Sequence, residues 1–193
     1  MTISLSNRSK NWLTLLAILV IFLAPLIVAL GFYSDKEIKF ATVNYGQLLE
    51  PPLDLGKLNL LNLDQSAFPS ASLKGHWLLI YLSAEDCAAN CQENLYKIRQ
   101  IRVATGKNQE RVERLLVSLP TDQASQVQLD GELEQVYPGQ LHALTTSAAL
   151  KQFLTPKLYE ELQKEGGILL LADPNNKVML SYTPQAPAQK ILN

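Results

Sequence analysis

The strongest structural signal in this chain is the sequence WLLIYLSAEDCAANC at residues 77–91. Its first six residues, 77–82, form an unbroken apolar and aromatic run, which predicts a strand buried on both faces of a sheet. After the acidic pair at residues 85–86, apolar side chains recur at the spacing of a helix, at Cys87, Cys91, Leu95 and Ile98. We therefore expect Cys87 and Cys91 on one face at the N-terminus of a helix, where unpaired backbone N–H groups and the helix dipole stabilise a thiolate.

Composition excludes several classes of protein. The chain has 193 residues, a net charge of −1 and only two cysteines. The absence of a basic excess argues against a nucleic-acid-binding protein. A scaffold held by disulfides needs several bridges, so that class is excluded too. No phosphate-binding loop, dinucleotide-binding glycine pattern or Ser-His-Asp signature is present in the sequence.

The N-terminal part predicts a membrane anchor. Residues 11–34 carry no charge and are almost wholly apolar, which is long enough for one helix to cross a hydrocarbon layer of about 30 Å. The alternative is a cleaved signal peptide with a small-x-small site at residues 29–31, but the apolar run exceeds a usual signal-peptide core. Arg8 and Lys10 precede the run, so residues 1–10 are predicted to be cytoplasmic and the domain to face the other side.

The remaining elements predict an α/β fold. We expect a linker at residues 35–56 and a single domain at 57–193, which is long enough to bury its own core. In order, the expected elements are an edge strand at 57–63, the strand and cysteine helix to about 104, a strand at 115–119, a loop at 124–140, a strand at 141–144, helical segments at 147–154 and 157–164, and a hairpin of 168–172 with 177–182. This order is thioredoxin-like, with a mainly parallel sheet and the hairpin as its antiparallel edge. Such a fold closes with a helix after the hairpin, and residues 188–193 leave barely one turn for it.

Several motifs together resemble the Sco/SenC family, membrane-anchored thioredoxin-fold factors that build the copper site of cytochrome c oxidase. The motifs are the anchor, NYGQLLEPP at 44–52, the Cys-x-x-x-Cys helix start, Thr145-Thr146 and LADP at 171–174. The small single-span Sco-like proteins of proteobacteria are especially similar, over roughly residues 44–182. The resemblance implies a single-pass protein of the inner (cytoplasmic) membrane with a periplasmic domain. It implies the lipid bilayer and cytochrome c oxidase subunits or assembly factors as partners, and leaves the oligomeric state open.

Two departures from that family concern metal binding. Sco proteins carry a proline after the first cysteine, where this chain has Ala88. They also bind copper with two cysteines and a histidine just before the strand that corresponds to 168–172, where this chain has Gly166-Gly167. His76 and His142 both precede predicted parallel strands, so we expect them at the opposite end of the sheet from the cysteines, roughly 17–20 Å away. Neither histidine is therefore expected to complete a Cys-Cys-His site within one chain.

Three interpretations of the cysteine pair stay open. Cys87 and Cys91 are the candidate catalytic pair for thiol–disulfide exchange, although thioredoxin-type enzymes use a two-residue spacer and a cis-proline where this chain has Gly166-Gly167. They are also the candidate ligands of transient Cu(I), a soft ion that two thiolates suit, with the third ligand from a partner or from Asp86 or Glu85, which are poor ligands for it. Alternatively, the domain is a non-catalytic binding module whose disulfide is structural.

A set of basic residues is the remaining candidate surface: Lys97, Arg99, Arg102, Lys107, Arg111 and Arg114. It predicts either a docking face for acidic headgroups or an acidic partner, or an ordinary solvated helix face.

Overall fold

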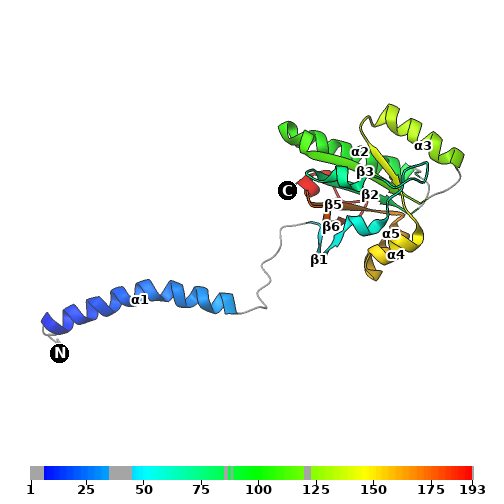
Figure 1. Cartoon of the computed structure of the whole chain (residues 1–193). Coiled ribbons are helices and arrows are strands. Elements are labelled where there is room, and N and C mark those ends of the chain that lie inside the picture. Colours follow the sequence, from blue (N-terminus) through cyan, green and yellow to red (C-terminus); the bar gives the residue numbers. More distant parts are fainter. Residues whose placement is uncertain (1–6, 35–44, 85–86, 88, 120–122, 193) are drawn as a thin grey trace. The chain divides into compact units, whose positions relative to one another are not determined.

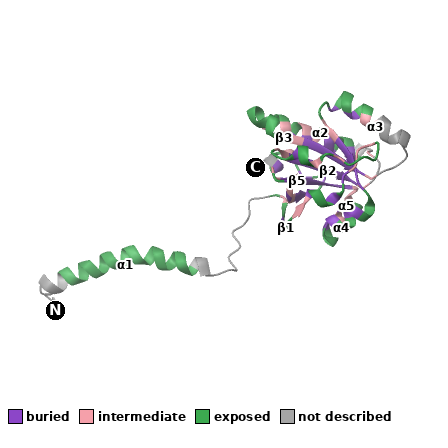
Figure 2. Ribbon diagram, in the orientation of Figure 1, coloured by how far each residue is buried: buried purple, intermediate pink, exposed green. Residues whose placement is uncertain are grey.

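The structure, a computed structural model, describes residues 7–34, 45–84, 87, 89–119 and 123–192. The chain divides into two units, Met1–Val43 and Asn44–Asn193. The first contains the helix α1 (Asn7–Ser34), within which Asn11–Gly31 is long and apolar enough to span a membrane (Figure 1). The described side chains of α1 are exposed (Figure 2), as expected for a helix whose apolar surface meets lipid.

The second unit is built on one six-stranded sheet in the order β1-β6-β5-β2-β3-β4. Its strands are β1 (Gln47–Asp54), β2 (Trp77–Ser83), β3 (Val112–Ser118), β4 (Leu141–Leu144), β5 (Gly167–Ala172) and β6 (Lys177–Tyr182). β2, β3 and β4 are parallel, whereas β5 is antiparallel to β2, and β6 and β1 continue the antiparallel half. The hairpin of β5 and β6 therefore lies inside the sheet, and the expectations that it forms an edge and that the sheet is mainly parallel are wrong.

Helices cover both faces of the sheet. Side chains of β2 point alternately to the two faces, so this strand contributes to a separate core on each side. Leu78, Ile80 and Leu82 join the core beneath α4 (Ser147–Phe153) and α5 (Pro156–Glu165). Leu79 and Tyr81 join the core beneath α2 (Ala89–Ala104), α3 (Gln123–Val136) and α6 (Ala188–Leu192). The prediction of a central strand buried on both faces is confirmed, and so is the mixed α/β thioredoxin-like fold (Figures 1 and 2).

One of the two edge strands of the sheet differs from the expected one. It is β1, within the segment expected to be the linker, while residues 57–63 contain the end of the 3₁₀ helix η1 (Leu55–Leu58) and only isolated bridges at Leu61. Pro51 and Pro52 argue against a strand in the sequence pattern, because proline has no N–H to donate to a β-ladder and is tolerated only at a sheet edge or irregularity. The register of β1 against β6 indeed shifts between Leu48 and Leu53.

The prediction of a loop at 124–140 is also wrong, because most of this segment forms the helix α3. Leu129, Leu133 and Tyr137 follow one another at four-residue intervals and pack into the core beneath α2. One apolar residue per turn among polar neighbours is a weak periodic signal. β3 begins at Val112, three residues before the strand expected at 115–119, directly after the 3₁₀ helix η3 (Gly106–Arg111).

The helices after β4 agree with the sequence. The Thr146 side chain accepts a hydrogen bond from the Ala149 N–H and caps α4. Thr155 caps α5 in the same way, with Pro156 in its first turn.

Candidate functional site

Cys87 and Cys91 form a disulfide at the end of β2 where the chain enters α2. Their Cα atoms lie 4.9 Å apart. α2 begins at Ala89, so Cys91 lies in its first turn and Cys87 precedes it, whereas the sequence predicted a helix from Cys87. The expected acidic turn at residues 85–86 lies outside the described residues.

The two cysteines differ in exposure. Cys91 is 3 % exposed and belongs to the core between α2 and the sheet. Cys87 is half-buried and only packs against that core from outside. An incoming thiol can therefore approach Cys87, while Cys91 is shielded by protein.

Glycines occupy the segment beside the cysteine pair. Gly167 is the first residue of β5 and lies opposite Ser83, the last residue of β2. A Cβ at Gly167 would overlap the hydroxyl of Tyr81, so this close approach requires glycine. Gly166 has a φ of 71°, the left-handed conformation that ends α5. Backbone conformation explains Gly166 and close packing explains Gly167, and neither of these two positions offers a side chain that could bind a metal.

His142 does not lie where the sequence placed it. β4 is short and pairs only with the second half of β3, so His142 aligns with Leu116 and, through it, with Tyr81. It is therefore near the same end of the sheet as the cysteines, two strands or roughly 10 Å to the side of β2. The expected separation of 17–20 Å along the strands is wrong for His142, while His76 does precede β2 at the far end.

The nitrogens of His142 have other neighbours. Nε2 lies 2.8 Å from Oγ of Ser118, and Nδ1 lies 3.6 Å from Oδ1 of Asp130 in α3. Burial lowers the pKa of His142, and the Asp130 carboxylate partly opposes that effect. Across the residues that the structure describes, no three His, Cys, Asp or Glu side chains gather as a metal site. No sequence pattern predicts this Ser118–His142–Asp130 contact, because the register of β3 and β4 brings Ser118 to His142 and the packing of α3 brings Asp130.

The basic residues do not form one surface. Lys97 is half-buried, and its ammonium donates to Oδ1 of Asn94 and to the carbonyl of Pro184; burial lowers its pKa. Arg102 donates from Nε to backbone carbonyls at 2.7 and 3.1 Å. Arg114 is buried and donates to the carbonyl of Pro138, and burial lowers its pKa. Half of the set is thus used inside the fold, which disfavours a continuous docking face.

The fold and site define a class: a thioredoxin-like domain with a cysteine pair at the start of a helix, preceded by a helix that could span a membrane. Residues 77–193 match the family described as transmembrane-like, thioredoxin-like, C-terminal domain, and the chain belongs to that family. No curated protein matches the sequence.

Solved structures with a similar fold include Sco proteins and a thiol:disulfide interchange protein. Yeast Sco1 is 17 % identical, with 73 % of this chain and 87 % of that chain covered and a TM-score of 0.52. Arabidopsis thaliana ScoI with copper bound is 13 % identical, with 73 % and 91 % covered and a TM-score of 0.50. A thiol:disulfide interchange protein from Bacteroides sp. is 13 % identical, with 77 % and 85 % covered and a TM-score of 0.50. At these identities the likeness is one of fold.

Proposed function

We propose that this protein is a membrane-anchored, Sco-like factor that exchanges thiols and disulfides with a partner during cytochrome c oxidase assembly. The observation that carries the proposal is the unequal exposure of Cys87 and Cys91, joined in a disulfide where β2 leads into α2. One sulfur is open to attack and the other is a protected leaving group. The role in oxidase assembly rests on the sequence resemblance to the Sco/SenC family, and the Sco structures of similar fold are consistent with it.

The exchange follows from the geometry. A partner thiolate attacks Sγ of Cys87, the Cys87–Cys91 bond breaks, and Cys91 leaves as a thiolate that takes up a proton. A second partner thiolate then attacks the partner sulfur of the mixed disulfide and releases Cys87. Two electrons pass from the partner to the pair, and the partner gains a disulfide. The reverse sequence of steps reduces a partner disulfide. The reduction potentials of the Cys87–Cys91 pair and of the partner set the direction.

Transient Cu(I) handling is a second candidate. The reduced pair offers two soft thiolates, one just before α2 and one in its first turn, and such ligands suit Cu(I). Gly166 and Gly167 offer no ligand, and Nε2 of His142 is hydrogen-bonded to Ser118, so we infer that a partner supplies the third ligand. We place this chemistry second because the described residues hold no complete ligand set.

The proposed location is the inner membrane, with residues 1–10 cytoplasmic and the thioredoxin-like domain in the periplasm. α1 and the positive charges of Arg8 and Lys10 support it. The oxidising periplasm is a compartment in which a disulfide forms and persists.

Oxidase activity in cells tests the proposal. Cells that carry the Cys87→Ser, Cys91→Ser double variant, at an unchanged protein level in the membrane, should lose cytochrome c oxidase activity. A Ser83→Ala variant serves as the matched control, since it alters a hydroxyl near the pair and keeps both sulfurs. Full oxidase activity in the double variant would leave the domain as a binding module with a structural disulfide.

A further inference from the structure

A cavity lies at the end of the sheet remote from the cysteine pair. Trp77 and Val112, the first residues of β2 and β3, line it, whereas Cys87 follows the last residue of β2. Leu79, the third residue of β2, also lines the cavity, and the four residues from there to the end of the strand separate the two regions by roughly 13 Å. The cavity is therefore independent of the thiol–disulfide site.

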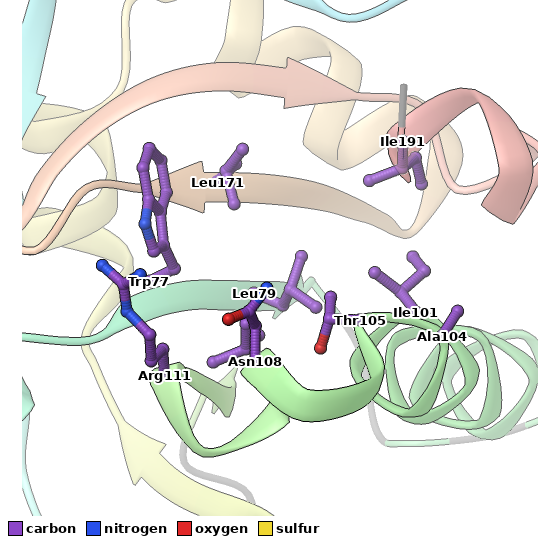
Figure 3. A pocket seen from close by; sticks show the side chains of 10 residues that line it. Trp77, Leu79, Ile101, Ala104, Thr105, Asn108, Arg111, Leu171 and Ile191 are labelled. Carbon is purple, nitrogen blue, oxygen red and sulfur yellow. The ribbon is translucent and has the colours of Figure 1, made fainter.

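The cavity has the size and walls of a small-molecule site. Its volume is about 540 Å³, and ligand pockets span about 300–1,000 Å³. Its lining comes from the sheet, from the end of α2, from η3 and from α6: Trp77, Leu79, Val112, Leu171, Ile101, Ala104, Thr105, Asn108, Arg111 and Ile191. Figure 3 shows Leu171 and Ile191 across the space from Asn108 and Thr105. The walls are thus mainly apolar, with polar groups on the η3 side.

The polar side of the cavity carries positive charge. Arg111 is exposed, and its side chain extends from η3 toward Trp77 (Figure 3). None of the described residues that line the cavity is acidic. Within the described part of the chain, neither the Arg111 guanidinium nor the Asn108 amide has a hydrogen bond or ion pair to another side chain. The Thr105 hydroxyl, in contrast, already donates to the carbonyl of Arg102 at 2.6 Å.

We propose that this cavity binds a small amphipathic carboxylate. Its carboxylate pairs with the Arg111 guanidinium and accepts from the Asn108 amide, since charge-assisted bonds to arginine are the strong ones. Its apolar body lies on Trp77 and Leu171, where it replaces water on exposed apolar surface. Charge complementarity selects an acid over a neutral compound of the same shape.

Trp77 provides the readout. The chain has two tryptophans, Trp12 and Trp77, so a Trp12→Phe background leaves the cavity residue as the single emitter. Full-length protein in nanodiscs is titrated with cyclohexylacetate and with the neutral cyclohexylacetamide, which do not absorb where tryptophan is excited. We expect saturable binding of the acid and binding about tenfold weaker for the amide.

Two pairs of variants locate the site. Arg111→Ala should weaken cyclohexylacetate binding about tenfold, whereas Lys107→Ala, on the same 3₁₀ helix but outside the lining, should leave it unchanged. Ala104→Phe should fill the cavity and abolish binding, whereas Val103→Phe places the same side chain outside it. Both members of each pair replace exposed side chains, so folding is preserved, and the arginine pair decides the question if the phenylalanine variants misfold.

Three results would overturn the proposal: no saturable fluorescence change with the acid, equal affinity for acid and amide, or equal effects of Arg111→Ala and Lys107→Ala. None of them would bear on the cysteine chemistry, because the cavity lies at the other end of β2.

Discussion

Cys87 and Cys91 share one disulfide but not one environment, since Cys91 is 3 % exposed and Cys87 is half-buried. After reduction, Cys87 should therefore react with iodoacetamide about tenfold faster than Cys91 under native conditions. Mass spectrometry of peptides taken at intervals measures the two rates. Equal rates in the native protein, as expected for the unfolded chain, would contradict the assignment of Cys87 as the exchanging thiol.

Copper binding should depend on the cysteines and not on the histidine near them. Anaerobic titration of the reduced protein against a competing chelator should give at most one Cu(I) per chain, lost in Cys87→Ser and in Cys91→Ser. His142→Gln should bind Cu(I) as the unmodified protein does, because Nε2 of His142 already lies 2.8 Å from the Ser118 hydroxyl. His76→Gln is the matched control at the far end of the sheet. A loss of affinity in His142→Gln alone would place that imidazole in the copper site.

His142 should make stability fall in mild acid. Burial lowers its pKa from the ordinary 6.5, so at higher pH the His142 imidazole is neutral in both the folded and the unfolded chain. As the pH falls below about 6.5, His142 takes up a proton in the unfolded chain first. The free energy of unfolding therefore decreases until the pH reaches the lowered pKa of the folded protein. Urea denaturation between about pH 7.5 and about pH 5 measures the loss.

Two variants separate this effect from general acid sensitivity. His142→Gln should reduce the acid-dependent loss of stability, because it removes the titrating group. Asp130→Asn should enlarge the loss, because the Asp130 carboxylate raises the pKa of His142. An unchanged pH profile in both variants would exclude His142 as its source.

Gly167 should tolerate no side chain. A Cβ there would overlap the Tyr81 ring and hydroxyl, so Gly167→Ala should destabilise the domain by about 1–3 kcal/mol, the usual cost of overpacking. Gly131→Ala is the matched control: its Cβ would meet nothing within 4 Å, and it lies inside α3. That change should stabilise the protein by up to about 1 kcal/mol, the helix preference of alanine over glycine. Equal denaturation midpoints for the two variants would refute the close packing of Gly167 on Tyr81.

The fold was predictable where local pattern and tertiary environment agree. The apolar run of β2, the helical spacing after the cysteines and the turn between β5 and β6 are strong signals, and the structure confirms each. β1 and α3 were missed because their signals are weak. Pro51 and Pro52 interrupt the strand, and α3 buries about one residue per turn.

The candidate site was predictable in composition but not in arrangement. Sequence alone identified Cys87 and Cys91, because two cysteines after a buried strand are a local feature. The position of His142 depends on which half of β3 the short strand β4 pairs with, and no local pattern encodes that register. The same register brings Ser118 to His142, so that contact could only be found in the structure.

The most direct test of the central claim is the trapping of a mixed disulfide. In the reverse sequence Cys87 attacks a partner disulfide and Cys91 resolves the adduct, so Cys91→Ser in cells should accumulate a covalent complex, visible on a non-reducing gel and released by reductant. Cys87→Ser should accumulate none, since its remaining sulfur is buried. A complex in Cys87→Ser, or none in Cys91→Ser, would contradict thiol–disulfide exchange at Cys87.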